Sequence, residues 1–126
     1  GLAFMVHTGW GGTFTLPALL IPRAQQYPDM PIILAHAGYS ANAGTEAIVA
    51  AQQCPNIYLE TSWCWAGDIR NMVQQVGADR VMMGTDLPEN VPAVLAIYEF
   101  LDVTAAEREA CLWTTAARLF GLPGRG

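Results

Sequence analysis

The sequence predicts an α/β fold in which four parallel strands alternate with helices. Short apolar runs begin near residues 2, 31, 57 and 80, and each is followed by turn residues and a helix-like segment. Regular units of roughly 23 to 29 residues form either a doubly wound sheet or a TIM (β/α)8 barrel. No GxGxxG or GxxxxGK[ST] phosphate loop follows the first run, which argues against a nucleotide-binding sheet. Because the barrel needs about 250 residues, the sequence favours half a barrel with an extra C-terminal helix.

The first two units begin with strands at 2–6 and 31–35. Both runs are apolar throughout, as expected for parallel strands that are buried on both faces. Between them, a glycine-rich loop at 9–12 leads to a helix at 16–26. Pro22 should interrupt this helix, because proline lacks the backbone donor that a helix interior requires.

The third unit follows a Gly/Ser/Asn-rich loop at 38–44 and a helix at 45–53, and its strand covers 57–61. A helix at 67–76 comes next. It ends at Gly77, since glycine adopts the left-handed conformation in which many helices terminate.

The fourth unit has a strand at 80–84 and a helix at 91–101. Thr104 and Glu107 then have the spacing of a capping box, in which two side chains satisfy backbone donors at the start of a helix. This box predicts a last helix that continues to about Phe120.

Composition excludes several classes of protein. The 126 residues are 52% apolar and only 13% charged, which suits one partial domain, 1–126, with a sizeable core and no internal boundary. A net charge of −5 without a basic cluster argues against nucleic acid and anionic membranes as partners. No apolar run approaches the roughly 20 residues of a membrane span.

The cysteines and the start of the chain indicate its setting. Cys54, Cys64 and Cys111 are far apart and form no CxxC motif, so we expect structural thiols in a reducing compartment and a cytoplasmic protein. The chain opens directly inside an apolar run, and we interpret it as a piece of a longer protein.

Three side chains that can bind metals follow apolar runs, namely His7, His36 and Asp86. The C-terminal ends of parallel strands open onto one face, so these side chains should meet there although the sequence separates them. Imidazole and carboxylate are common ligands of Zn²⁺ and similar ions, and a carboxylate can also take a proton from water. The pattern therefore predicts a catalytic site with a divalent metal, for which zinc is the expected ion.

Four further residues are candidates for contact with a substrate. Glu60 lies inside the third strand, where its side chain could face the barrel interior, the metal or polar groups of a neighbouring unit. Trp63 and Trp65 could form an apolar wall for substrate or simply pack, and Tyr39 could supply a hydroxyl at the mouth. The sequence leaves these alternatives open.

Five segments occur along the chain in a specific order. They are His7-Thr8-Gly9, YPDMPIILAHAG, PNIYLETS, GADRVMMGTDLP and AARLFGL. Together they resemble the amidohydrolase-related family, a branch of the amidohydrolase superfamily that includes aminocarboxymuconate semialdehyde decarboxylase. The resemblance covers nearly the whole chain and rests on the set of segments.

The resemblance implies a distorted TIM barrel of which this chain is the C-terminal half, strands five to eight. It also implies that His7 is a metal ligand, that His36 polarises substrate or water near the metal, and that Asp86 binds metal and moves a proton. The His-x-His pair that the family carries on its first strand is absent from this sequence. A full-length form that binds a small-molecule substrate and forms homo-oligomers is expected.

These roles give a first hypothesis, a metal-dependent hydrolase that cleaves a C–N or ester/lactone bond of a small carboxylated or cyclic substrate. Metal-activated water would attack the carbonyl, while Asp86 accepts a proton and His36 stabilises the oxyanion. The alternative uses the same groups for non-oxidative decarboxylation of an aromatic or muconate-like acid. A third hypothesis is a non-catalytic half-barrel, whose unpaired edge strands would invite association.

Overall fold

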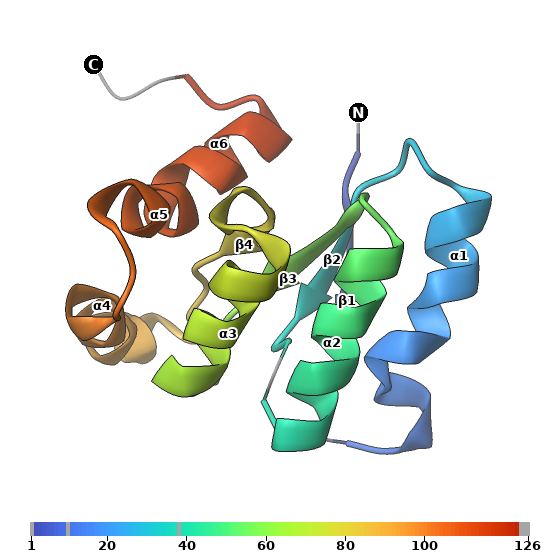
Figure 1. The fold of residues 1–126 in the computed structure, drawn as a ribbon, viewed down its shortest axis with the longest axis horizontal. Coiled ribbons are helices and arrows are strands. Elements are labelled where there is room, and N and C mark those ends of the chain that lie inside the picture. The colour runs from blue at the N-terminus through green and yellow to red at the C-terminus, as the bar shows by residue number, and fades with distance from the viewer. Residues whose placement is uncertain (1, 10, 38, 124–126) are drawn as a thin grey trace.

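The computed structural model describes residues 2–9, 11–37 and 39–123. Its centre is a four-stranded parallel sheet in the order β1-β2-β3-β4 (Figure 1). The strands are β1 (Phe4–His7), β2 (Ile32–Ala35), β3 (Ile57–Glu60) and β4 (Val81–Met82). The helices are α1 (Ile21–Gln26), α2 (Ala41–Gln53), α3 (Ala66–Val76), α4 (Val91–Phe100), α5 (Ala105–Glu109) and α6 (Thr115–Phe120). Each strand pairs with the next one in the sequence, as successive βα units require.

The helices gather on one side of the sheet. In Figure 1, α2 and α3 stand in front of the strands, α1 lies beside α2, and α4, α5 and α6 form a group beyond β4. Strands in sequential order with helices outside them are the arrangement expected for half of a (β/α) barrel.

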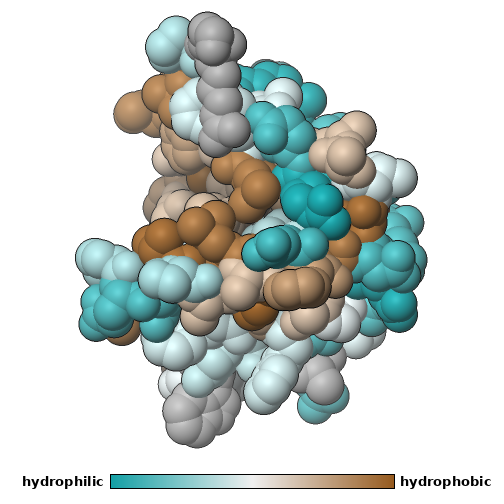
Figure 2. Space-filling model, turned by 90° about the vertical axis from the view of Figure 1, so that its left-hand side faces the viewer, coloured by the Kyte–Doolittle hydropathy of each residue, from teal (hydrophilic) through white to brown (hydrophobic). Residues whose placement is uncertain are grey.

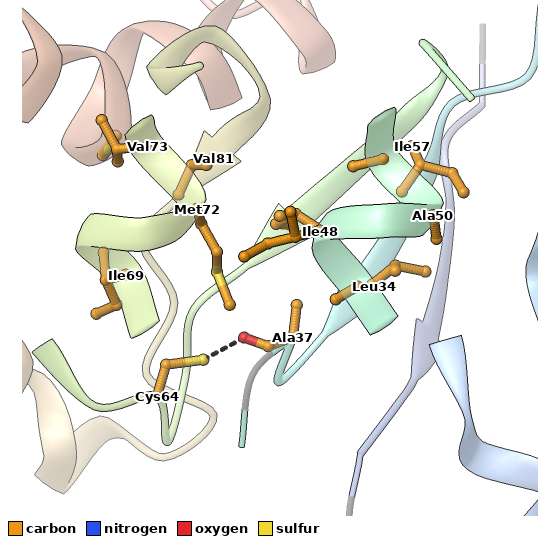
Figure 3. Packing of buried hydrophobic residues seen from close by; sticks show 14 of the residues in the cluster. Leu34, Ala37, Ile48, Ala50, Ile57, Cys64, Ile69, Met72, Val73 and Val81 are labelled. Carbon is orange, nitrogen blue, oxygen red and sulfur yellow. Dashed lines mark hydrogen bonds between the residues drawn. The ribbon is translucent and has the colours of Figure 1, made fainter. Parts of the chain in front are cut away.

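The core lies between the strands and the helices α2 and α3. Figure 3 shows side chains of β2, β3 and β4 close to those of the two helices. Leu34, Ile57 and Val81 from the strands are fully buried, as is Met72 of α3. Burial of each such side chain contributes about 1.5–3 kcal/mol, so this layer fixes the strands relative to the helices.

The prediction of a fully buried first strand is wrong. Phe4 and Met5 of β1 are 51% and 53% exposed, whereas every residue of β2 is buried as predicted. Among the described residues, β1 is at the edge of the sheet and pairs with β2 alone, so no described strand lies on its other side. The strand also starts and ends later than the predicted 2–6, so His7 is its last residue.

The helix predicted at 16–26 consists of a 3₁₀ turn, Pro17–Leu20, followed by α1. Pro22 does not interrupt α1, because it lies in the first turn, where the missing backbone donor has no partner to lose. Residue 10 of the predicted 9–12 loop lies outside the described residues.

The helix predicted at 45–53 begins earlier, at Ala41. The hydroxyl of Ser40 accepts a hydrogen bond from the Ala43 N–H at 3.3 Å and caps the first turn. Most of the predicted 38–44 loop is therefore helical, and residue 38 lies outside the described residues. The helix predicted at 67–76 is confirmed as α3, and Gly77 ends it with a φ of 104°.

The last helix contains one π-helical turn. Thr104 and Glu107 form the predicted capping box at the start of α5, and residues Ala110–Thr114 then form the π turn before α6. Within this turn the Thr115 N–H bonds to the carbonyl of Ala110. The carbonyl of Cys111 is thereby left to accept the Met83 N–H at 2.8 Å.

This bond also explains why β4 is shorter than the predicted 80–84. Residues Ala78–Arg80 form a 3₁₀ turn, so the strand starts only at Val81. The N–H of Met83 donates to the carbonyl of Cys111 in the π turn, so it does not extend the hydrogen-bond ladder between β3 and β4.

Apolar side chains remain exposed over the C-terminal helices. Figure 2 views the side formed by α4, α5 and α6 and shows hydrophobic side chains in a band across its middle. In α4, Leu95 is 45% and Phe100 84% exposed. Within the described residues, no helix has the length and apolar character needed to cross a bilayer.

Candidate active site at the C-terminal ends of the strands

The two histidines meet at the C-terminal end of the sheet. His7 ends β1 and His36 directly follows β2, and these strands pair in register so that His7 lies opposite Ala35. The two imidazole rings are 5.0 Å apart between centroids, with an edge-to-face angle of 63°. The topology thus brings together two side chains that are far apart in the sequence.

The backbone of His36 turns sharply at this point. Its φ is 61°, a left-handed conformation that is uncommon for residues other than glycine. The N–H of His36 donates a 3.0 Å hydrogen bond to Oε2 of Glu60 on the neighbouring strand. A residue held in such a conformation by long-range bonds is a feature of functional sites.

Glu60 is the centre of a buried hydrogen-bond network. Its side chain is only 9% exposed. Besides the His36 N–H, the carboxylate accepts the N–H of Ser62 at Oε1 and the hydroxyl of Ser62 at Oε2, both at 2.8 Å. One partner of Glu60, the His36 N–H, belongs to a neighbouring unit, the other two belong to Ser62 in the loop that follows β3, and Glu60 also lines the pocket beside His36.

Ser62 connects this carboxylate to the imidazole. Its Oγ lies 2.5 Å from Nδ1 of His36. Because the hydroxyl proton is directed to Glu60, the imidazole must donate from Nδ1, and we assign the Nδ1–H tautomer to the neutral ring on this basis. The Nε2 atom of His36 is then the ring nitrogen that can exchange protons with a substrate.

Gly84 gives the Glu60 carboxylate its space. A Cβ atom at residue 84 would lie 1.6 Å from Oε1 of Glu60, so a larger residue there would force the Glu60 side chain to move. Sequence reasoning missed both Gly84 and Ser62 as site residues. The signal that could have found Gly84 is a glycine at the end of a predicted strand, which often marks close approach of another group.

Asp86 lies in the loop after β4, again with a left-handed φ of 59°. Its Oδ2 accepts a 3.0 Å hydrogen bond from Nε1 of Trp63, whose own φ is 63°. The ring of Tyr39 contacts the indole edge-to-face at 6.3 Å. Trp63 therefore contacts Asp86 directly, and Tyr39 contacts Trp63.

Two separate pockets lie near these residues. The first, with a volume of about 330 Å³, is lined by both His36 and Asp86 together with apolar side chains. These are Met5, Met82, Met83 and Phe120. The second, of about 400 Å³, is lined by Tyr39, Trp63 and Trp65, and Trp65 is 74% exposed.

The residues that could hold a metal ion form only part of a ligand set. His7, His36 and Asp86 carry suitable donor atoms for a divalent cation. In residues 2–9, 11–37 and 39–123, however, no three His, Cys, Asp or Glu side chains are grouped closely enough to hold one. The prediction that these three side chains surround one ion is therefore not supported within this part of the chain, and further ligands would have to come from elsewhere.

Two of the buried cysteines, Cys64 and Cys111, lack the properties of reactive nucleophiles. Burial raises the pKa of the Cys64 thiol, and the negative charge of Glu60 raises it further. Burial likewise raises the pKa of Cys111 to about 12. Both groups remain protonated at neutral pH, and the thiolate is the reactive form.

Comparison with known proteins identifies the family. A family model described as Amidohydrolase matches residues 1–122. The chain belongs to the amidohydrolase family. This confirms the relationship that the five sequence segments predicted. No curated protein sequence matches the amidohydrolase chain.

Solved structures resemble the amidohydrolase chain in fold. A 2,6-dihydroxybenzoate decarboxylase in complex with 2,6-dihydroxybenzoate has a TM-score of 0.65 at 20% identity, over 83% of this chain and 40% of its own. A dihydroxybenzoic acid decarboxylase from Polaromonas sp. JS666, with bound manganese and 2-nitroresorcinol, has a TM-score of 0.67 at 20% identity, over 86% and 40%. An amidohydrolase from Burkholderia multivorans has a TM-score of 0.57 at 22% identity, over 84% and 51%.

The chain thus spans about half or less of the length of these structures. Its four sequential βα units match a part of their fold, which confirms the prediction of an α/β half-barrel with an extra C-terminal helix. The assignment of these units to strands five to eight of the whole barrel stays a prediction.

Proposed function

We propose that the protein containing this chain is a metal-dependent decarboxylase of a small aromatic acid. The observation that carries this proposal is the buried chain of hydrogen bonds from Glu60 through Ser62 to His36. It ends at an imidazole that lines a pocket of suitable size, and it leaves Nε2 as the site of proton exchange. The resemblance in fold to two dihydroxybenzoate decarboxylases supports the same choice.

Non-oxidative decarboxylation needs a proton donor at carbon. The bond between the ring carbon and the carboxylate breaks, its electron pair stays on the ring carbon, and a proton must reach that carbon as CO₂ leaves. In our proposal His36, protonated at both nitrogens, delivers the Nε2 proton while Nδ1 stays bonded to Ser62. Glu60 holds both the hydroxyl and the His36 backbone, so the imidazole cannot turn away.

The pocket beside His36 suits a flat apolar ring. Met5, Met82 and Met83 contribute thioether or hydrocarbon contacts, which are favourable to aromatic groups, and Phe120 adds an aromatic one. Asp86 lies on the same pocket wall and would orient the polar substituents of the substrate or carry protons.

His7 and Asp86 would contribute to holding a divalent cation, with the remaining ligands supplied from outside this chain. When bound, such a cation supplies positive charge that orients the oxygen atoms of a substrate and stabilises negative charge on them. The donor types favour zinc, and the manganese in the Polaromonas structure makes manganese a second candidate.

The test uses the full-length protein, loaded with Mn²⁺ or Zn²⁺, and 2,6-dihydroxybenzoate. We expect CO₂ release, with solvent deuterium incorporated at the ring carbon in D₂O. His36→Asn should lower kcat by about 10²–10⁴-fold. Asparagine tolerates the left-handed backbone and keeps an N–H near the position of Nδ1, so this change removes little besides Nε2.

Two results would contradict the proposal. One is CO₂ release by His36→Asn at the rate of the unchanged protein. The other is an absence of CO₂ from every hydroxybenzoate tried, combined with hydrolysis of lactone or amide substrates by the same preparation.

The second result would favour the other candidate, a hydrolase. The family description and the Burkholderia amidohydrolase favour it. In that reaction Asp86 would take a proton from the attacking water. His36 would give its Nε2 proton to the leaving group. Product analysis of the same assay separates the two candidates, because hydrolysis leaves the carboxylate in place.

A further inference from the structure

We infer that Trp63 is a positioning residue that fixes the carboxylate of Asp86 in the active site. The inference rests on the proposed function, because it assigns Trp63 a task toward a group of that site. The interpretation of Trp63 as part of a wall for substrate stays a prediction beside it, since Trp63 also lines the pocket with Tyr39 and Trp65.

The hydrogen bond between the two side chains has only one possible direction. An indole can only donate, so Nε1 of Trp63 donates to Oδ2 of Asp86, at 3.0 Å. The acceptor is a carboxylate, which makes the bond charge-assisted and stronger than one between neutral groups. Because the bond holds one carboxylate oxygen, it restricts the positions that the other oxygen can take.

The loop after β3 is built to present this indole. Ser62 and Cys64, on either side of Trp63, are 1% and 5% exposed, so they anchor the loop inside the protein. The Cys64 thiol donates to the carbonyl of Ala37 in the preceding unit, as Figure 3 shows. Between these anchors the backbone of Trp63 turns left-handed and directs its side chain outward to the loop after β4.

The conformation is unusual for so large a side chain. A positive φ at a bulky residue persists only where the surrounding structure maintains it, and Asp86 has the same unusual backbone. Aspartate adopts this backbone more readily than tryptophan does, so the unusual conformation is that of Trp63, and its hydrogen bond to Asp86 is one of the contacts that can maintain it.

Tyr39 restrains the indole from the other side. Its ring meets that of Trp63 at an angle of 71° and a centroid distance of 6.3 Å, within the range of favourable edge-to-face contacts. Trp65 offers a contrast within the same loop, since it has an ordinary extended backbone and is 74% exposed. Only Trp63 of these two tryptophans reaches the site.

Loss of the indole N–H should free the Asp86 carboxylate to rotate. The experiment compares Trp63→Phe, which keeps an aromatic ring but removes the donor, with Trp113→Phe as a matched control in the π-helical turn of the last helix. In the full-length protein, Trp63→Phe should lower kcat by about tenfold or more and leave KM nearly unchanged. Chelator competition with Zn²⁺ should show a loss of metal affinity of about tenfold or more, which a purely structural role would not cause.

A spectroscopic measurement tests the bond without activity. The indole proton of Trp63 should resonate downfield in the 1H–15N spectrum of the full-length protein, and Asp86→Ala should move it upfield. If Trp63→Phe does not fold, this measurement decides, because an indole signal that stays in place in Asp86→Ala overturns the inference.

The outcomes separate the inference from the proposed function. If Asp86→Asn retains full decarboxylase activity, the role of Asp86 in the proposed function fails. If Asp86→Asn is inactive while Trp63→Phe matches Trp113→Phe in kcat and in Zn²⁺ affinity, only the inference about Trp63 is overturned.

Discussion

Gly84 and Ser62 are small residues that determine the surroundings of Glu60. Ser62 places a hydroxyl on the carboxylate and on His36 at once, and Gly84 leaves room for the carboxylate to lie against the backbone. Both effects depend on size as much as on chemistry, because a larger side chain at either position would displace the carboxylate that orients the imidazole.

Gly84→Ala should destabilise the protein by about 1–3 kcal/mol, the usual cost of forcing extra volume into a packed site. It should also lower kcat, because Glu60 must move. Gly67→Ala is the matched control, since a Cβ there meets no atom within 4 Å and alanine suits a helix. The control should be neutral or more stable by up to about 1 kcal/mol. Urea unfolding of the three proteins checks both, and equal stability of Gly84→Ala and the unchanged protein would contradict the geometry of this contact.

Sequence reasoning placed His7, His36 and Asp86 at strand ends because apolar runs and turn residues mark those ends directly. It could not place Ser62, because a serine two residues after a glutamate reveals nothing until the loop turns back on itself. Nor could it foresee that Trp63 would take one oxygen of Asp86, a contact between loops of two units.

Hydrogen bonds at the ends of elements determine where the helices and strands stop. Ser40 starts α2 earlier than the glycines in that segment suggested, and the bond from Met83 to Cys111 ends β4 early. The Ser40 cap is a local signal that the sequence contains. Several other residues in the same segment can also cap a helix, so the sequence does not show which of them begins α2. The bond from Met83 to Cys111 is a long-range contact, which no local pattern encodes.

The capping box of α5 gives a pH-dependent contribution to stability. The backbone N–H and hydroxyl of Thr104 donate to the carboxylate of Glu107, and these bonds lower the pKa of Glu107. Since the folded pKa lies below the unfolded one, the contribution is complete above the unfolded pKa. It is lost as the pH falls through the folded pKa.

We therefore expect Glu107→Gln to be less stable than the unchanged protein at neutral pH, with the difference shrinking in acid. Thr104→Ala should cost about 1 kcal/mol at neutral pH, because it removes the cap itself. Thermal unfolding at a series of pH values checks both. A Glu107→Gln difference that grows toward acid pH would show that the sign is wrong.

At the scale of the whole molecule, the β1 edge of the sheet exposes apolar side chains. β1 forms the edge of the sheet with Phe4 and Met5 half exposed, while the chain spans 40% of each of the two decarboxylase structures. An edge strand with exposed apolar side chains favours association with further strands. Homo-oligomeric assembly of the full-length protein and a cytoplasmic location stay predictions.

Phe4→Lys should have opposite effects in two settings. In residues 1–126 alone, a lysine on the edge strand should reduce self-association, since charge protects exposed edges. In the full-length protein it should lower stability, because the strand would then be covered and the charge buried. Light scattering and thermal unfolding measure the two effects. Unchanged stability of the full-length variant would mean that β1 remains an exposed edge there.

The π-helical turn makes the end of the chain sensitive to its number of residues. Deleting one residue between 110 and 114 would rotate all that follows by about 100° around the helix axis. Thr115 would then lose its hydrogen bond to the carbonyl of Ala78, and Arg118 its bond to that of Asp79. The loss of a single position in this turn should therefore disrupt the packing of the chain's last helix on the turn before β4.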